Sequence, residues 1–331
     1  MSEAPSRVLA HVLVTGGAGF IGSHLVDALL ARPDTRVTVL DALTYAGSMT
    51  NLTQHDEEPR MRFVHGDVAD PQVVGPLVAE ADRVLHAAAE SHVDRSITGP
   101  AAFVQTNVVG TQVLLEACRT TGVPMLMVST DEVYGAGAND DSLFDEDAPL
   151  APRSPYAASK AAADLLCRAY HVTYAAAVTV VRGTNAFGPR QNPEKAIPTY
   201  ATAALDGRPL PVYGEGKQRR EWLFVTDWAA GCLAAMDRGE PGVVYNIGAG
   251  LELSNLELAR RICALADADP SLISFVDERP GHDFRYGVRA DRLRALGWSP
   301  EVGFDDGLRR TVEWYSTNRQ WASSMREAAG P

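Results

Sequence analysis

The stretch Val8-Leu-Ala-His-Val-Leu-Val14, followed by Thr15-Gly-Gly-Ala-Gly-Phe-Ile-Gly22, decides the fold of this chain. The first part is a short apolar run typical of a buried strand, and residues 21–31 after the glycines have helical spacing. This pattern, apolar strand and then helix, recurs along the first half of the chain and predicts an α/β fold with a Rossmann-like, doubly wound parallel sheet. Further strands are predicted at residues 37–40, 61–64, 83–86, 124–128 and 178–181.

The bulk properties of the chain exclude several classes of protein. Its 331 residues carry 30 Lys and Arg against 42 Asp and Glu, and this net charge of -12 argues against a nucleic-acid-binding protein. The four cysteines lack C-x-x-C spacing, so we expect no metal site. No apolar run approaches the ~20 residues that span a bilayer, and residues 1–11 do not resemble a signal peptide. We therefore expect a cytoplasmic protein without a membrane partner.

The glycine loop is a candidate dinucleotide site. Gly16, Gly19 and Gly22 follow a predicted strand and open a predicted helix, which is where such a motif binds a pyrophosphate. Asp41 lies 19 residues after Gly22, at the end of the next strand, where a carboxylate binds a ribose diol and would repel a 2′-phosphate. We therefore predict NAD rather than NADP as the cofactor.

Other candidate cofactor residues follow the strand ends of the same domain. Asp67 suits a contact with the adenine amino group, although an Asp that caps a turn fits the sequence equally well. Small residues after His86 would let the strand end pass close to the cofactor. The full set also includes Phe20, Ile21, Thr44, Val68, Ala87 and Ala88.

Two side-chain pairs carry the candidate chemistry. Tyr156 and Lys160 lie four residues apart on a predicted helix over residues 154–174, so they share one face, and the ammonium would lower the pKa of the phenol. Asp131 and Glu132 follow a predicted strand end, where open α/β sheets bind ligands. A phenolate base, an acid and a second base suit oxidation followed by elimination on a sugar.

The amino-acid composition changes after Arg182, where proline and glycine become frequent. We place an NAD-binding domain in residues 1–182 and a smaller substrate-binding lobe in residues 183–331, with some later segments crossing back to the first domain. Residues 322–331 have the composition of a frayed tail.

These motifs together resemble the extended short-chain dehydrogenase/reductases, and among them the dTDP-glucose 4,6-dehydratase family. The resemblance covers nearly the whole chain and is most specific at Ser129-Thr-Asp-Glu-Val-Tyr-Gly135. Further matching segments are Leu40–Gly47, Ala88–Ser96, Ser154–Lys160, Gly188-Pro-Arg-Gln191, Pro193-Glu-Lys195, Arg220-Glu-Trp222 and Gly281-His-Asp283.

The resemblance implies a closed redox cycle on a nucleotide-linked glucose. Tyr156 would deprotonate the C4 hydroxyl while hydride passes to NAD, with Thr130 orienting that hydroxyl and Lys160 holding the nicotinamide ribose. Glu132 would remove the C5 proton, and a protonated Asp131 would release the C6 hydroxyl as water. Hydride would then return to C6. The product would serve deoxysugar synthesis for a glycosylated secondary metabolite.

The resemblance also assigns residues to a nucleotide-sugar pocket. Arg220 and Asn185 would bind the diphosphate, while Glu194 and Lys195 would line the sugar pocket. The other members of the predicted set are Ser91, His92, Asn255, Arg279 and His282. His92 fits a structural role nearly as well.

The chain departs from the family pattern in places. Gly183-Thr184, Ala186-Phe187 and Trp228 stand where relatives usually have Cys or Ser, Asn-Tyr and a polar residue. These changes leave open which nucleobase and which sugar the substrate carries, so a UDP-sugar or a modified hexose fits as well.

Two other functions fit parts of the sequence. A nucleotide-sugar epimerase or decarboxylase would share the fold but needs no acid directed at C6, so Asp131 discriminates against it. A non-catalytic NAD-binding protein would have no use for Tyr156, Lys160 and the two carboxylates together. The predicted helices at 107–118 and 156–174 could pair with their copies as a four-helix bundle, as family members commonly do, so we predict a homodimer.

Overall fold

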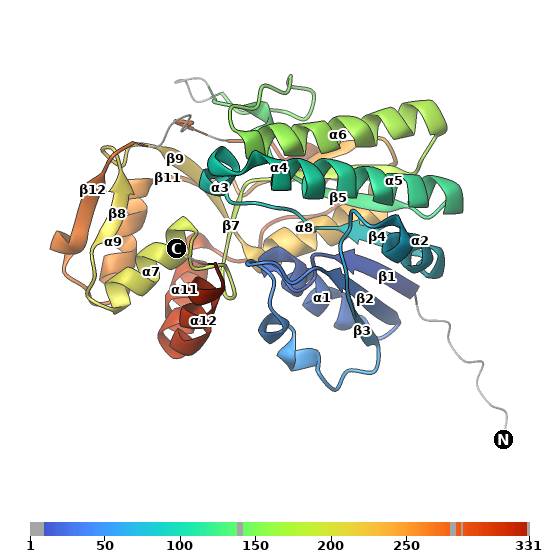
Figure 1. Cartoon of the computed structure of the whole chain (residues 1–331). Coiled ribbons are helices and arrows are strands. Elements are labelled where there is room, and N and C mark those ends of the chain that lie inside the picture. The colour runs from blue at the N-terminus through green and yellow to red at the C-terminus, as the bar shows by residue number, and fades with distance from the viewer. Residues whose placement is uncertain (1–9, 138–141, 279–282, 286, 330–331) are drawn as a thin grey trace.

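The centre of the molecule is a seven-stranded, all-parallel sheet (Figure 1). The structure is a computed structural model and describes residues 10–137, 142–278, 283–285 and 287–329. The strand order β10-β6-β5-β4-β1-β2-β3 runs outward in both directions from β1, which confirms the predicted doubly wound fold. The strands are β1 Ala10–Thr15, β2 Thr35–Asp41, β3 Met61–His65, β4 Arg83–His86, β5 Met125–Thr130, β6 Val178–Gly183 and β10 Val244–Ile247.

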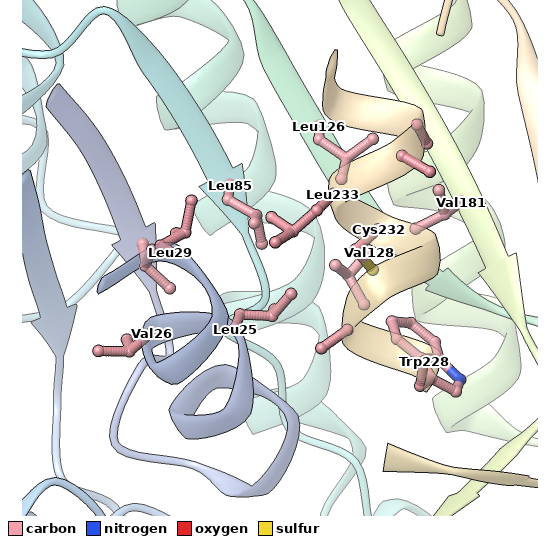
Figure 2. Packing of buried hydrophobic residues seen from close by; sticks show 14 of the residues in the cluster. Leu25, Val26, Leu29, Leu85, Leu126, Val128, Val181, Trp228, Cys232 and Leu233 are labelled. Carbon is pink, nitrogen blue, oxygen red and sulfur yellow. The ribbon is translucent and has the colours of Figure 1, made fainter. Parts of the chain in front are cut away.

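Helices cover both faces of this sheet because alternate strand residues point to opposite sides. Val12 and Val14 of β1 pack on one side, whereas Leu13 packs on the other. The first face is covered by α1 Phe20–Leu30, α8 Val225–Arg238 and α10 Asp291–Ala295, and the second by α2 Pro71–Glu80, α5 Gly110–Thr121 and α6 Pro155–Tyr174. Figure 2 shows the first cluster, in which side chains of α1 and α8 meet those of β4, β5 and β6.

The helix predicted at residues 107–118 begins differently from the expectation. Two short helices, α3 Val93–Thr98 and α4 Pro100–Phe103, lead into a π-helical turn, Val104–Val109, before α5 starts at Gly110. In Figure 1, α5 and α6 run alongside each other across one side of the molecule.

The later part of the chain builds a smaller lobe with its own apolar core. Its strands are β7 Asn185–Phe187, β9 Arg219–Phe224 and β11 Glu252–Ser254 in one sheet and β8 Leu210–Tyr213 and β12 Ile273–Val276 in another. Its helices are α7 Ala196–Leu205, α9 Asn255–Leu265, α11 Phe304–Thr317 and α12 Arg319–Ala329. Between these elements the chain returns to the large sheet through α8 and β10. The boundary at residue 182 stays a prediction.

The frayed tail expected from residue 322 is wrong over most of its length, because those residues belong to helix α12. Ala322 and Met325 are buried, and the Trp321 ring packs against Trp314 with the centroids 4.8 Å apart. The Trp321 indole also donates to Asn51 Oδ1 at 3.0 Å. The helix has a strong apolar stripe that its charged and small residues disguise in the sequence.

Candidate active site

A cleft of about 310 Å³ lies at the carboxyl ends of the parallel strands. It collects all the residues predicted to bind the cofactor and all those predicted to be catalytic, from separate βα loops and from α6. These residues are Gly16, Gly19, Phe20, Ile21, Gly22, Asp41, Thr44, Asp67, Val68, Ala87, Ala88, Thr130, Asp131, Glu132, Tyr156 and Lys160.

The glycine loop is shaped by two close approaches of backbone to backbone. Gly16 has φ +71°, and a β-carbon there would lie 2.6 Å from Ala88 Cα. A β-carbon at Gly22 would lie 1.9 Å from the Gly16 carbonyl oxygen. Helix α1 then begins after Gly19 with no side chain capping its first turn, so its N-terminal N–H groups face the cleft as an anion site.

Asp41, at the end of β2, holds two loops together. Its Oδ2 accepts a hydrogen bond from Ala18 N at 2.9 Å, and its Oδ1 accepts one from Leu43 N at 2.8 Å. Burial raises its pKa, and these two hydrogen bonds partly offset that rise. The carboxylate keeps further lone pairs for a ribose diol, since each oxygen can accept more than one hydrogen bond.

Asp67 lies on the rim of the same cleft and is exposed. Its Oδ1 accepts a hydrogen bond from Ala69 N at 2.8 Å, so it caps the turn after β3. The capping role that fits the sequence is therefore present, and the adenine contact stays a prediction.

The acidic pair follows β5 on a single 3₁₀ turn, Asp131–Tyr134. Thr130 caps this turn: its hydroxyl accepts from Glu132 N at 3.3 Å and donates to Asp131 Oδ1 at 3.2 Å. Asp131 is 3% exposed, and its Oδ2 is buried with no hydrogen-bond partner among the described residues. Burial, and then the charge of Glu132, raise the pKa of Asp131 well above its usual value, as the sequence predicted.

Tyr156 and Lys160 are both buried at the start of α6, one helical turn apart. Lys160 Nζ donates to the Val128 carbonyl at 2.6 Å, and burial lowers its pKa to about 8. The expected lowering of the Tyr156 pKa is wrong for this arrangement. Burial and the nearby charge of Glu132 raise it, because water is withdrawn from the phenol and a like charge lies beside it.

A buried ion pair fixes the catalytic elements relative to one another. Arg182 on β6 donates to both oxygens of Asp164 on α6, at 2.7 and 3.1 Å, and both side chains are buried. The same guanidinium donates to the Tyr134 hydroxyl at 2.9 Å, and that hydroxyl donates to Asn246 Oδ1 at 2.7 Å. The helix that carries Tyr156 is thereby tied to the turn after the acidic pair. The sequence analysis missed this network, since no local motif marks it.

Comparison with known proteins agrees with this geometry. The family model described as GDP-mannose 4,6 dehydratase matches residues 13–311. A dTDP-glucose 4,6-dehydratase of Streptomyces niveus is 48% identical over 329 residues, which cover 96% of this chain and 97% of that protein. The chain belongs to the dTDP-glucose 4,6-dehydratase family. The resemblance predicted from the motifs is confirmed.

Two further relatives show how widely the family is spread. The low-salt glycan biosynthesis protein Agl12 of Haloferax volcanii is 51% identical over 305 residues, covering 92% of this chain and 98% of that protein. The structure of DesIV, a dTDP-glucose 4,6-dehydratase from Streptomyces venezuelae solved with NAD bound, matches with a TM-score of 0.92 at 48% identity. That match covers 95% of this chain and 99% of DesIV.

The residues that the family resemblance assigned to the sugar are only partly gathered at the cleft. Ser91, Asn185, Glu194 and Lys195 line it, and Lys195 Nζ donates to the Ser91 carbonyl at 2.7 Å. Glu194 Oε2 lies 3.2 Å from the Nε of Arg95.

Three other residues predicted for the sugar pocket are described by the structure but do not line the cleft. His92, Arg220 and Asn255 are not among the lining residues, although the charge of Arg220 acts on Asp131 and Arg220 Nη2 donates to the Asp283 carbonyl at 2.8 Å. Asn255 is the first residue of α9. Arg279 and His282 fall outside the described residues.

Gly183 and Trp228, two positions expected to depart from the family pattern, lie against each other. A β-carbon at Gly183 would lie 2.1 Å from Cζ2 of Trp228, so the indole occupies the space that a side chain at residue 183 would need. The Trp228 indole donates to the Thr184 carbonyl at 3.1 Å and forms part of the cleft wall. Figure 2 shows Trp228 at the edge of the apolar cluster, beside Val128. The large side chain of Trp228 therefore requires glycine at residue 183.

Polar cleft residues to which the sequence analysis gave no role are Glu90, Thr106, Ser129, Thr184, Gln191 and Asn192. Gln191 falls in a segment that matches the family, but nothing in the sequence says which way its side chain points. Its placement depends on contacts between segments far apart in the chain.

Replacing Asp131 by Asn tests the buried-acid interpretation through stability. Folding raises the pKa of Asp131, so below the pKa of the unfolded chain the carboxyl is protonated in both states and its titration does not affect stability. As the pH rises from the unfolded-state pKa through the folded-state pKa, the unfolded chain releases the proton more readily than the folded protein, and the free energy of unfolding falls. Asp131→Asn should therefore melt at a higher temperature than the wild type at neutral and alkaline pH and at a similar temperature near pH 4.

The measurement is thermal unfolding across this pH range, with Asp56→Asn at an exposed position as the control. A difference between wild type and Asp131→Asn that stays constant at every pH would contradict the interpretation.

Proposed function

We propose that this protein is an NAD-dependent dTDP-glucose 4,6-dehydratase, which removes water from the glucose unit and leaves a 4-keto-6-deoxy sugar. The observation that carries the proposal is the Asp131–Glu132 pair facing the same cleft as Tyr156 and Lys160. Relatives of that name at 48% identity over nearly the whole chain support it, as does the NAD bound in DesIV.

The cleft has the features that NAD requires. The uncapped start of α1 suits the pyrophosphate, and Asp41 suits the adenosine ribose because a carboxylate accepts hydrogen bonds from a diol. Lys160 can donate to the nicotinamide ribose, since an ammonium has three donors and one is used on Val128. When bound, NAD supplies a reversible acceptor for the hydride of the sugar.

In the first step Tyr156 takes the proton of the C4 hydroxyl as that carbon is oxidised to a ketone. Tyr156 acts in this step as its phenolate, so it must first give up its own proton against the rise in pKa that burial causes. The phenolate formed in this way is a strong base. Lys160, whose pKa of about 8 leaves it mostly charged at neutral pH, provides positive charge on the same face of the helix. The hydroxyl of Thr130 lies beside the phenol of Tyr156 and orients the C4 hydroxyl of the sugar.

In the second step the new ketone makes the C5 proton acidic, and Glu132 removes it. Asp131 gives its proton to the C6 hydroxyl, which then leaves as water. Burial and the charge of Glu132 raise the pKa of Asp131 and thereby favour its protonated form, and its Oδ2, which has no hydrogen-bond partner among the described residues, is placed to donate into the cleft. Return of the hydride to C6 and of a proton to C5 completes the product.

The alternative of an epimerase or decarboxylase on the same fold is less well supported. Neither reaction protonates a leaving group at C6, so neither has a use for a protonated, desolvated Asp131. A non-catalytic NAD-binding protein would gain nothing from burying Asp131, Tyr156 and Lys160 around one cleft, because each burial costs free energy.

Tyr156→Phe tests the proposal. The wild type should convert dTDP-glucose without added NADH to a product lighter by one water, with a C6 methyl group and a C4 ketone, as followed by NMR and mass. The variant should lose about 10²-fold to 10⁴-fold in turnover because the base is gone. Its NAD affinity, measured by calorimetry, should change little. Tyr245→Phe, which alters a buried hydroxyl on β10, is the matched control. Wild-type rates in Tyr156→Phe would contradict the assigned role.

The nucleobase of the substrate is tested with a panel of nucleotide-linked hexoses. If the wild type leaves dTDP-glucose unchanged but dehydrates UDP-glucose or another nucleotide hexose, the reaction stands and the substrate is corrected. Failure with every member, by protein that binds NAD, would overturn the enzymatic assignment.

We also propose a homodimer in which α5 and α6 pair with their copies as a four-helix bundle. Leu165 and Val172 lie seven residues apart on α6, hence on one face, and are 52% and 73% exposed. Val104, on the π-helical turn before α5, is 51% exposed. Large exposed apolar side chains on neighbouring helices are typical of a protein–protein contact.

Leu165→Glu should break this dimer, because it buries a charge in an apolar interface. Light scattering at micromolar concentration should give a dimer mass for the wild type and a monomer mass for the variant. Leu265→Glu changes an exposed leucine on α9 and should leave the dimer intact. A wild-type monomer would contradict the proposal.

We propose that the enzyme works in the cytoplasm and supplies a keto-deoxysugar for a glycosylated secondary metabolite. All four cysteines are buried free thiols, which suits a reducing compartment. In the part of the chain that the structure describes, none of the helices is long and apolar enough to span a bilayer.

A further inference from the structure

Two adjacent side chains in the cleft, Gln191 and Asn192, have polar atoms without partners. Gln191 is 7% exposed and Asn192 is 6% exposed, and both line the cleft. Gln191 Oε1 and Asn192 Nδ2 are buried and make no hydrogen bond within the described residues. A buried polar atom without a partner is costly to the folded state, so such atoms in a binding cleft indicate contacts with a ligand.

The partners of each amide fix which atom is left for a ligand. Gln191 Nε2 donates to the Ala186 carbonyl at 2.8 Å, and a carbonyl can only accept, so the remaining atom of Gln191 is its acceptor oxygen. Asn192 Oδ1 accepts from Glu194 N at 3.1 Å, so the remaining atom of Asn192 is its donor nitrogen. Consecutive residues thus present one acceptor and one donor. A primary carboxamide, which has an N–H donor and a carbonyl acceptor, complements both.

The segment that carries these residues is held in place from three sides. Tyr315 donates to the Gln191 carbonyl, and the neighbouring Arg190 pairs with Asp27 of α1 and donates to the Asn51 carbonyl at 2.9 Å. Arg190 has φ +65°, a left-handed backbone conformation that is unfavourable for arginine and that these contacts stabilise. The amides are therefore set before a ligand binds, which favours specific recognition.

The position of this segment indicates which part of NAD it meets. Asp41 marks the adenosine end of the cleft, and Tyr156 marks the reacting end. Gln191 bonds to Ala186, three residues after the end of β6, and Thr184 in the same stretch presents another buried hydroxyl with no partner among the described residues. Because β6 lies next to β5, which ends at Thr130, the two amides belong to the reacting end.

We propose that Gln191 and Asn192 bind the carboxamide of the nicotinamide ring, Gln191 Oε1 accepting from its N–H and Asn192 Nδ2 donating to its carbonyl. The proposal rests on the cofactor of the proposed function. Holding the carboxamide fixes the rotation of the ring, and thereby the face that exchanges hydride with the sugar. The two residues are positioning residues for the hydride transfer.

The test uses 3-acetylpyridine adenine dinucleotide, in which a methyl group replaces the carboxamide nitrogen. Calorimetry on cofactor-depleted full-length protein gives the dissociation constants of NAD and of this analogue. The wild type should bind NAD about 10-fold more tightly, since one hydrogen bond is lost with the analogue. Gln191→Met should weaken NAD about 10-fold and the analogue little, so that the preference disappears.

Asn192→Asp provides an independent arm. It replaces the donor by an acceptor, and both dinucleotides have the carbonyl, so both should weaken by about the same factor while the preference for NAD remains. Gln72→Met, at an exposed position of α2, is the control, and thermal unfolding establishes that each variant is folded.

Four results would overturn the proposal. Equal weakening of NAD and the analogue by Gln191→Met would place its contact away from the carboxamide nitrogen. Unchanged binding by both variants would remove the contacts altogether. Equal affinity of the wild-type protein for NAD and the analogue would also overturn the proposal. Wild-type protein that binds neither dinucleotide would overturn the proposed function as well, which separates that failure from the others.

Discussion

The buried ion pair between Arg182 and Asp164 is the interaction on which the geometry of the site depends. It joins strand β6 to the helix that carries Tyr156 and Lys160. Through Tyr134 it also holds the turn that presents Asp131 and Glu132. Removing one member of such a pair typically costs about 3–5 kcal/mol because the other charge stays buried. The ion pair thus holds the acid and base groups, which come from different segments, at fixed positions relative to one another.

Withdrawal of water then gives each group its role. Asp131 and Tyr156 hold their protons more firmly than usual, and Lys160 holds its proton less firmly, as their pKa values show. The withdrawal of water that raises the pKa of Asp131 also raises that of Tyr156, so the same burial favours a protonated acid and makes the phenolate, once formed, a strong base. Trp228 forms part of the cleft wall, and its indole leaves no room for a side chain at residue 183.

The sequence predicted what depends on local pattern. The strand and glycine loop at residues 8–22, the acidic pair and the Tyr–Lys spacing each have a fixed relation to the backbone, so the fold class and the residues around the cleft could be predicted. The sequence could not predict what depends on distant contacts. Helix α12 is stabilised by packing against α11 and by the bond from Trp321 to Asn51, which lies 270 residues earlier.

The site residues Gln191 and Asn192 were missed for a different reason. Gln191 and Asn192 matter because of the atoms left over after their partners at residues 186 and 194 are satisfied, and no spacing rule reveals that. The expected lowering of the Tyr156 pKa failed for a related reason. Spacing places Lys160 on the right face of the helix but does not show how deeply the phenol is buried or that Glu132 lies close by.

In the proposed reaction, one cleft removes a hydride from C4 of the sugar and returns the same hydride to C6. This transfer can be followed by incubating the purified protein with dTDP-glucose deuterated at C4, without added nicotinamide cofactor, and locating the deuterium in the product by NMR. We expect deuterium in the C6 methyl group of a 4-keto product. A dehydrated product without deuterium at C6, or recovery of a C4 epimer with the label still at C4, would rule this transfer out.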